Sequence, residues 1–174
     1  MIYLQCTKRA QARLGLSQST LQAAGASESR LGSWSLHVIP LAGRLGYLFM
    51  NDRSLLSFVI MEGKQGVELS DLLLFLETGV RNVGNLLGLP ADPLTDVLKD
   101  FEEIGIAAAP SRSICGLLSS LGTDYAEFVS RRAGRRSVDM SEVIAAVNNK
   151  PRAKLGFATS SEVALGLLLQ TSEA

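Results

Sequence analysis

The strongest concentration of charge in the sequence is a run of four arginines, Arg131, Arg132, Arg135 and Arg136. Guanidinium groups this close together bind phosphate oxygens in pairs, which would suit a nucleic acid. The run also follows a long amphipathic segment, and basic side chains at the C-terminal end of a helix complement its dipole. Both interpretations stay open, although few aromatic residues are interleaved with the arginines to stack on single-stranded bases.

The residue types and motifs that carry most enzyme chemistry are scarce. His37 is the only histidine, which excludes a zinc site with several histidines and any mechanism that needs two. Neither the G-x-S-x-G motif nor the G-x-x-x-x-G-K-S/T motif occurs. We therefore expect no catalytic residue, no metal and no cofactor, and we favour a non-enzymatic domain over an enzyme.

Cys6 and Cys115 are the only cysteines, and their separation matches no metal-binding or redox motif. Two such cysteines are typical of proteins from a reducing compartment. At the N-terminus the basic residues follow the apolar ones, which is the reverse of a secretory signal. No apolar run reaches the roughly 18 residues that span a membrane. The sequence thus predicts a soluble, cytoplasmic protein without membrane contact.

Length and composition predict one globular domain over residues 1–174. Of the 174 residues, 47% are hydrophobic, and 17 basic side chains balance 17 acidic ones. A chain of this size buries roughly 70% of the surface that it exposes when unfolded. Zero net charge gives no general attraction to nucleic acid or to an anionic membrane. An unidentified protein or a small anionic ligand is therefore the expected partner, and nucleic acid is the less favoured one.

Residues 1–61 are predicted to form most of a sheet. Apolar and polar side chains alternate over four stretches that we expect to be strands, at residues 2–6, 33–41, 45–50 and 55–61. Tight turns between the last three strands indicate an antiparallel meander. Residues 17–32 show no clear period, so we expect a flexible loop there.

Residues 67–174 are predicted to be mostly helical, because the apolar period changes from two to 3.6. The expected elements are a short strand at 106–109 and helices at 70–87, 92–104, 111–132, 141–149 and 160–170. Gly79 and Gly84 lie inside the first of these helices, where they indicate close helix packing. Strands that precede helices predict an α+β fold, with a small antiparallel sheet and its helices on one face.

Short motifs are spread over much of the chain. They are a strand leading into Cys6-Thr7-Lys8-Arg9, Trp34 near the start of the second strand, a strand that ends in Asn51-Asp52, and a helix start at Arg112-Ser113-Ile114-Cys115-Gly116. Together these motifs resemble an uncharacterised bacterial family, a domain of unknown function of about this length, over residues 2–130. The resemblance supports the fold and implies no activity.

Candidate ligand-binding residues are those members of the motifs that are polar, reactive or aromatic and stand at element ends. They are Cys6, Thr7, Lys8, Trp34, Asn51, Asp52, Arg112 and Ser113. Arg112 begins a helix, where the dipole disfavours a cation, so we expect it to pair with Asp52 or to line a pocket with Lys8 and Trp34. The sequence favours a binding or interaction domain. The alternatives are a small-ligand or anion site, with or without enzymatic activity, and nucleic-acid association.

Overall fold

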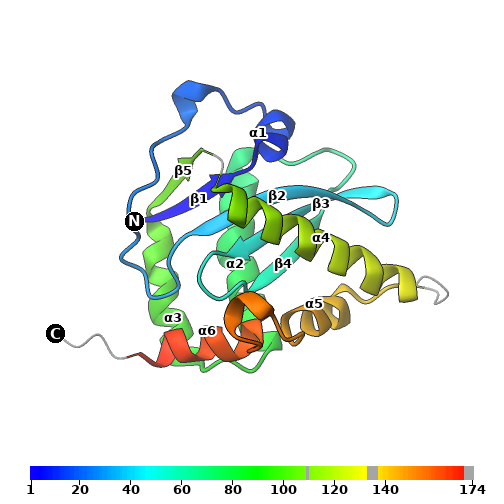
Figure 1. Ribbon diagram of the computed structural model, residues 1–174. Coiled ribbons are helices and arrows are strands. Elements are labelled where there is room, and N and C mark those ends of the chain that lie inside the picture. Colours follow the sequence, from blue (N-terminus) through cyan, green and yellow to red (C-terminus); the bar gives the residue numbers. More distant parts are fainter. Residues whose placement is uncertain (109, 133–136, 171–174) are drawn as a thin grey trace.

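The computed structural model describes residues 1–108, 110–132 and 137–170, and these form one five-stranded sheet covered by helices (Figure 1). The strands lie in the order β4-β3-β2-β1-β5. Their bounds are Ile2–Cys6 for β1, Trp34–Leu41 for β2, Arg44–Asn51 for β3, Ser57–Met61 for β4 and Ile104–Ala107 for β5. The predicted strands are thus present, each within two residues of its expected ends.

The sheet is mixed, which corrects the prediction of an antiparallel sheet. β2, β3 and β4 form the predicted antiparallel meander, but β1 runs parallel to both β2 and β5. Parallel neighbours need a long crossover connection. Residues 7–33 provide one between β1 and β2, and they include helix α1 (Lys8–Leu14) and a 3-10 turn (Gln18–Thr20).

The segment 17–32, predicted as a flexible loop, follows the outer edge of β5 for part of its length. The N–H of Gln22 donates to the carbonyl of Ile106 at 2.8 Å, and Gln22 and Ala107 form a parallel bridge. Gly25 lies close to the ring of Tyr3. The segment therefore covers one edge of the sheet and leaves β4 as the other edge.

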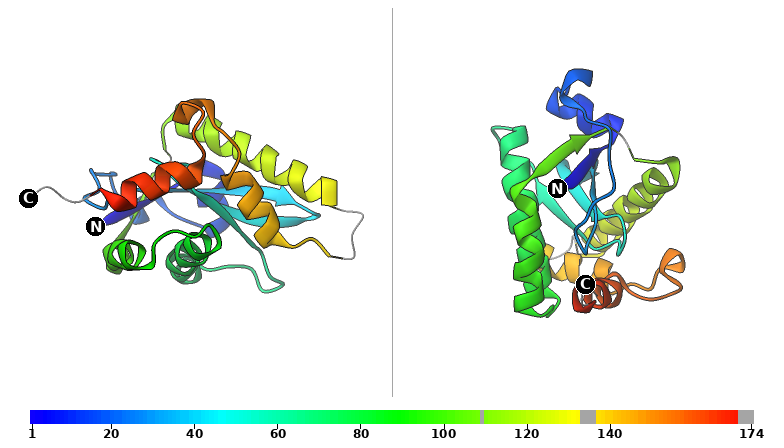
Figure 2. Two further views of the ribbon diagram at one scale, coloured as in Figure 1. Left: turned by 90° about the horizontal axis from the view of Figure 1, so that it is seen from below. Right: turned by 90° about the vertical axis from the view of Figure 1, so that its left-hand side faces the viewer.

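Helices cover both faces of the sheet rather than one (Figure 2). On one side lie α2 (Leu69–Leu86) and α3 (Ala91–Leu98), and α6 (Ser160–Leu169) packs against α3. On the other side lie α4 (Arg112–Arg132) and α5 (Met140–Asn148). The physical reason is that the strands are apolar on both sides. On β2, for example, Trp34 and Leu36 face the α2 layer while Ile39 and Leu41 face the α4 layer.

Two buried clusters form the core, one on each side of the sheet. On the α2 side, Trp34 packs against Phe58 and Phe101 with ring centroids 5.9 and 6.5 Å apart. Tyr125 and its apolar neighbours fill the α4 side. The alternating apolar residues divide between the two clusters: Leu4, Trp34, Leu36 and Val38 lie on the α2 side, and Leu48, Met50, Leu55 and Val59 on the α4 side.

Local sequence sets where the helices begin and how closely they pack. Asp71 accepts a hydrogen bond from the N–H of Glu68, so α2 begins at a capping box there. Gly79 confirms the predicted close packing, because a Cβ there would lie 2.1 Å from the ring of Phe58. In the described part of the chain, no helix has the length and hydrophobicity needed to cross a membrane.

Candidate binding site at the edge of the sheet

The eight residues predicted to bind a ligand differ in exposure and do not line a common cavity among those of the described structure. Trp34 is fully buried in the aromatic core. Cys6 is also buried, and burial raises the pKa of its thiol to about 12, so it is not a thiolate at neutral pH. Lys8, Arg112 and Ser113 are exposed. None of the eight lines the cavities described below, and ligand binding by these residues stays a prediction.

Asn51 has a structural role in the turn between β3 and β4. Its Nδ2 donates to the carbonyls of Leu31 and Ser33 at 2.7 and 3.2 Å, and its Oδ1 accepts the N–H and the hydroxyl of Ser54, both at 2.9 Å. The side chain is completely buried. Its amide therefore joins the crossover segment to the turn and is not available to a ligand.

Asp52 is bound by two neutral side chains and not by Arg112. Gln5 Nε2 donates to Oδ2 at 2.9 Å, and Ser35 Oγ donates to Oδ1 at 2.6 Å. Burial raises the pKa of Asp52 to about 6, although the bond from Ser35 acts in the opposite direction. Among the described residues, Arg112 forms no ion pair, so the predicted pairing with Asp52 is wrong. Gln5 and Ser35, adjacent across β1 and β2, supply the partners instead.

The arginine run is described only in part. Arg131 forms an ion pair with an acidic residue one turn earlier on α4, and Arg132 lies 3.5 Å from Glu142. Both therefore have acidic neighbours, and Arg132 also donates to the carbonyl of Phe128 at 3.3 Å, in line with the helix-end interpretation. Arg135 and Arg136 lie outside the described residues, so the nucleic-acid hypothesis stays a prediction.

β4 presents an open edge of the sheet, and its hydrogen bonds to β3 show which groups face outward. The N–H of Asn51 donates to the carbonyl of Leu56, and the N–H of Glu62 donates to the carbonyl of Leu45, each at 2.8 Å. In an antiparallel pair, every second residue bonds to the partner strand. Leu56, Glu62 and the alternate residues between them therefore face β3.

The remaining residues of β4, Ser57, Val59 and Met61, point their N–H and C=O groups away from the sheet. Asn148 on α5 bonds both groups of Ser57, because its Oδ1 accepts the N–H at 2.9 Å and its Nδ2 donates to the carbonyl at 2.7 Å. Within the described ranges, Val59 and Met61 have no such partner on this side. The edge is thus closed at Ser57, while the outward groups of Val59, which is buried, and of Met61, which is half-buried, have no partner in the described structure.

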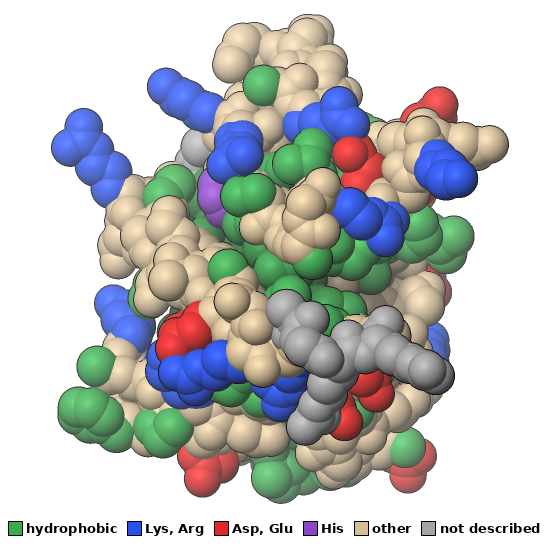
Figure 3. Space-filling view, turned by 90° about the vertical axis from the view of Figure 1, so that its right-hand side faces the viewer, with side chains coloured by type: hydrophobic (Ala, Val, Ile, Leu, Met, Phe, Trp, Pro, Cys, Tyr) green, Lys and Arg blue, Asp and Glu red, His purple; other side chains and the backbone are tan. Residues whose placement is uncertain are grey.

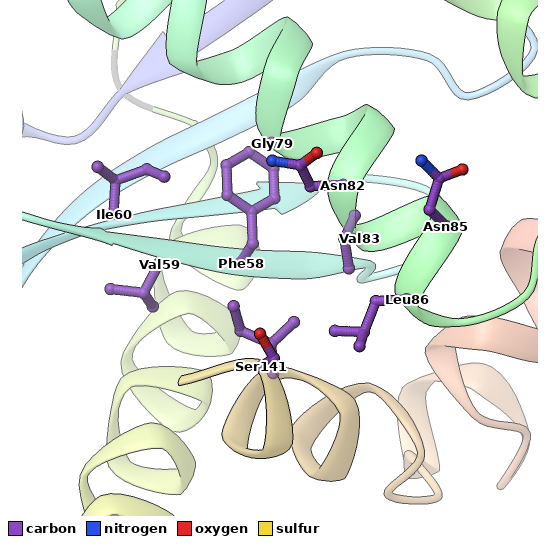
Figure 4. A pocket seen from close by; sticks show the side chains of 10 residues that line it. Phe58, Val59, Ile60, Gly79, Asn82, Val83, Asn85, Leu86 and Ser141 are labelled. Atoms are coloured by element: carbon purple, nitrogen blue, oxygen red, sulfur yellow. The ribbon is translucent and has the colours of Figure 1, made fainter. Parts of the chain in front are cut away.

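A cavity of about 500 Å³ lies beside this open edge, between α2 and α5 (Figure 4). Figure 4 shows Asn82 and Asn85 on the α2 side and Ser141 on the α5 side. Apart from these three polar residues the lining is apolar. The full set is Phe58, Val59, Ile60, Gly79, Asn82, Val83, Asn85, Leu86, Ser141 and Ile144. Asn82, Asn85 and Ser141 are exposed. The cavity therefore has an apolar floor and amide and hydroxyl groups at its rim.

A second cavity, of about 490 Å³, continues along the same strand. It includes Ile60 and Met61 on β4, the following turn from Gly63 to Val67, and Asp71 and Phe75 on α2. Ile60 lines both cavities. The two cavities and the open backbone between them form one groove, called here the β4 groove.

The lining of the first cavity is suited to binding and not to proton transfer. It contains no ionisable side chain among its described residues. Nor do three or more His, Cys, Asp and Glu side chains come together as a possible metal site in the described part of the chain. The first cavity thus offers backbone donors and acceptors, apolar surface and amides, and the second adds the charged side chains of Lys64 and Asp71 at the far end of the groove.

Comparison with known protein families assigns the chain to a family whose activity is not known. The profile of DUF6933, a domain of unknown function, matches residues 3–163. The chain belongs to this family. The expected membership in a family of unknown function is confirmed, and the DUF6933 match extends beyond residue 130, where the resemblance was expected to end. Bacterial origin stays a prediction. No curated protein matches the chain.

Sequence reasoning missed the β4 groove because β4 was expected simply as the last strand of a meander. Its position at the sheet edge depends on where β1 and β5 insert. One available signal was Asn148, a polar residue next to Val147 on a helix with an apolar face. A buried amide in such a place needs partners, and here they are the two backbone groups of Ser57.

Proposed function

We propose that this protein is a non-enzymatic binding domain whose β4 groove takes up an extended peptide segment of a partner protein. The observation that carries the proposal is the pair of outward-facing residues Val59 and Met61, whose backbone groups lack partners in the described structure next to an apolar cavity. An unpaired strand edge is a template for another strand. Peptides bound in this way gain affinity from backbone bonds and specificity from pockets for alternate side chains.

The groove also indicates what kind of peptide would fit. Side chains on an added strand point alternately to its two faces. Here those faces are bounded by α2 and α5, and Val83, Leu86 and Ile144 supply apolar surface between them. Asn82 and Asn85 at the rim can bond peptide carbonyls and amides. A segment with apolar residues at alternate positions and few charges is therefore the expected ligand.

The geometry supports an enzyme less well, because the eight candidate residues of the sequence do not converge. We also place the protein in the cytoplasm, on the support of its two free thiols. Cys6 and Cys115 are both unpaired, and unpaired cysteines persist in reducing compartments.

The first experiment selects peptides from a random display library on the purified protein and follows amide hydrogen exchange. In the free protein the Val59 and Met61 amides should exchange faster than those of Phe58 and Ile60, which bond β3. Selected peptides should slow the exchange of the Val59 and Met61 amides. Peptides that bind without protecting either amide, or a library that yields no binder, would contradict the proposal.

A matched pair of variants removes one donor of the groove. Met61→Pro loses the outward N–H while the bonds of its neighbours to β3 remain, and proline is tolerated at such edge positions. Met61→Ala loses the same side chain but keeps the N–H. Selected peptides should bind Met61→Ala several-fold more tightly than Met61→Pro, provided that both variants keep the circular dichroism spectrum of the parent. Equal affinities for the two variants would contradict strand addition.

A further inference from the structure

A separate cavity of about 260 Å³ lies between α1, β2 and α4 and shares no residue with the β4 groove. Its polar lining comes from Arg9, His37, Ser119 and Thr123, and its apolar part includes Ile39 and Pro40. This cavity is called here the α1–α4 pocket. Its described lining residues include no aspartate or glutamate, and its basic groups are Arg9 and the imidazole of His37.

Arg9 reaches this pocket without a partner of its own. It is exposed, and among the described residues no acid forms an ion pair with it and no group accepts its hydrogen bonds. Arg13, one turn further along α1, differs because it forms an ion pair with Glu62 at 2.5 Å. The guanidinium of Arg9 therefore has its full set of donors available to a ligand.

His37 is held so that one ring nitrogen stays available. Its Nδ1 lies 3.0 Å from Thr7 Oγ1, which also accepts the N–H of Ala10 as the N-cap of α1. A threonine hydroxyl that accepts from Ala10 can still donate its proton to Nδ1. In that arrangement Nε2 carries the ring proton and is a donor without a described partner.

Arg9 and His37 line the same cavity, and the charge of Arg9 acts on the ring. Burial, and then the charge of Arg9, lower the pKa of His37, so the ring is neutral at neutral pH. Figure 3 shows the histidine, the only one of the chain, at the surface next to Lys or Arg side chains. On α4, the hydroxyls of Ser119 and Thr123 donate to carbonyls one turn earlier, at 3.0 and 3.1 Å. They can rotate toward a ligand.

We propose that the α1–α4 pocket binds the anionic group of a small molecule, a phosphate or a carboxylate, with Arg9 and the Nε2 of His37 as its donors. Hydrogen bonds in which one partner is ionised are the stronger ones, and a guanidinium can hold two oxygens at once. Ile39 and Pro40 provide surface for an apolar part of the ligand. An anion in this position favours the protonated ring, so affinity should rise as the pH falls through the pKa of His37.

The experiment uses nuclear magnetic resonance of the intact protein labelled at histidine, because a single histidine gives a single set of ring signals. Inorganic phosphate and acetate are titrated separately at constant ionic strength set with chloride. A saturable shift of the His37 signals, with a higher pKa in the bound state, supports the pocket. A response to phosphate alone identifies a phosphate site, and a response to both identifies a general oxyanion site.

Two neighbouring variants separate a specific site from general charge. Arg9→Gln should weaken binding of the anion by about tenfold or more, because it removes a charged donor. Lys8→Gln removes the same charge from the adjacent exposed residue and should change the affinity by less than about threefold. His37→Gln, followed by calorimetric titration, should also weaken binding. Equal losses in Arg9→Gln and Lys8→Gln, or a His37 signal that responds to phosphate no more than to chloride, would overturn the proposal.

Discussion

The side-chain amide of Asn148 on α5 bonds both backbone groups of Ser57 on β4. The N–H of Ser57 donates to Oδ1 at 2.9 Å, and Nδ2 donates to the carbonyl of Ser57 at 2.7 Å. Both residues are completely buried. One side chain thus does for Ser57 what a neighbouring strand would do, and it sets the point at which the β4 groove begins.

Asn148→Ala should be strongly destabilising for this reason. The change leaves the N–H and C=O of Ser57 buried without partners, and each unsatisfied group costs about 1–3 kcal/mol. We expect the free energy of unfolding to fall by about 2–4 kcal/mol in urea denaturation. Asn85→Ala, the same change at an exposed position, should stay within about 0.5 kcal/mol. A small effect at both positions would show that water replaces the amide of Asn148.

Asp52→Asn should stabilise the protein at neutral pH and not in acid. Since burial raises the pKa of Asp52 from 3.8 to about 6, the folded chain keeps a proton that the unfolded chain releases between these values. The stability that Asp52 contributes is fully present below pH 3.8 and is lost as the pH rises through about 6. At neutral pH we expect Asp52→Asn to gain about 1–2 kcal/mol.

The measurement for Asp52→Asn is thermal or urea unfolding of the parent and the variant as a function of pH. The two stability curves should meet below pH 3.8, diverge between pH 3.8 and about 6, and run parallel above that. If the variant instead becomes less stable than the parent as the pH rises, the ionised carboxylate is stabilising. The hydrogen bonds from Gln5 and Ser35 would then outweigh its burial.

Replacing either of two helical glycines by alanine should change the free energy of unfolding, but in opposite directions. At Gly79 a Cβ would lie 2.1 Å from the Phe58 ring, which is stacked on Phe49 at 4.9 Å and cannot easily move. Gly79→Ala should therefore lower the free energy of unfolding by about 3 kcal/mol. At Gly116 nothing lies within 4 Å of such a Cβ, so Gly116→Ala should raise it by about 0.5–1 kcal/mol through helix propensity. Urea denaturation of both variants checks the pair, and a shift in the same direction would refute the packing argument.

Leu76→Ala tests the apolar stripe of α2. Leu76 is completely buried on the α2 side of the sheet, while Leu74, two residues earlier, is 62% exposed. Truncation of Leu76 should cost about 2–5 kcal/mol, because it removes buried surface and leaves a cavity. Leu74→Ala should change the stability by no more than about 0.5 kcal/mol. Calorimetric unfolding of the two variants is a direct comparison, and similar losses would mean that α2 packs differently.

How the strands and helices follow one another was determined by sequence alone, because local periodicity needs no knowledge of partners. The alternation of apolar and polar side chains over residues 34–61 predicted the meander. The helical spacing of the apolar residues Leu72, Leu76 and Val80 predicted α2 and its buried face. The close packing at Gly79 was also readable, since glycine in a helix interior is unfavourable unless a neighbour needs the space.

Which strands lie side by side was decided only by the tertiary structure. The position of β1 between β2 and β5 depends on backbone hydrogen bonds between distant segments, and backbone groups are the same in every residue. That position makes β4 an edge. The Asn148–Ser57 contact spans 91 positions of the sequence, and Asp52 meets Gln5 across 47. Such contacts form when packing brings complementary groups together, so the candidate sites became visible only in three dimensions.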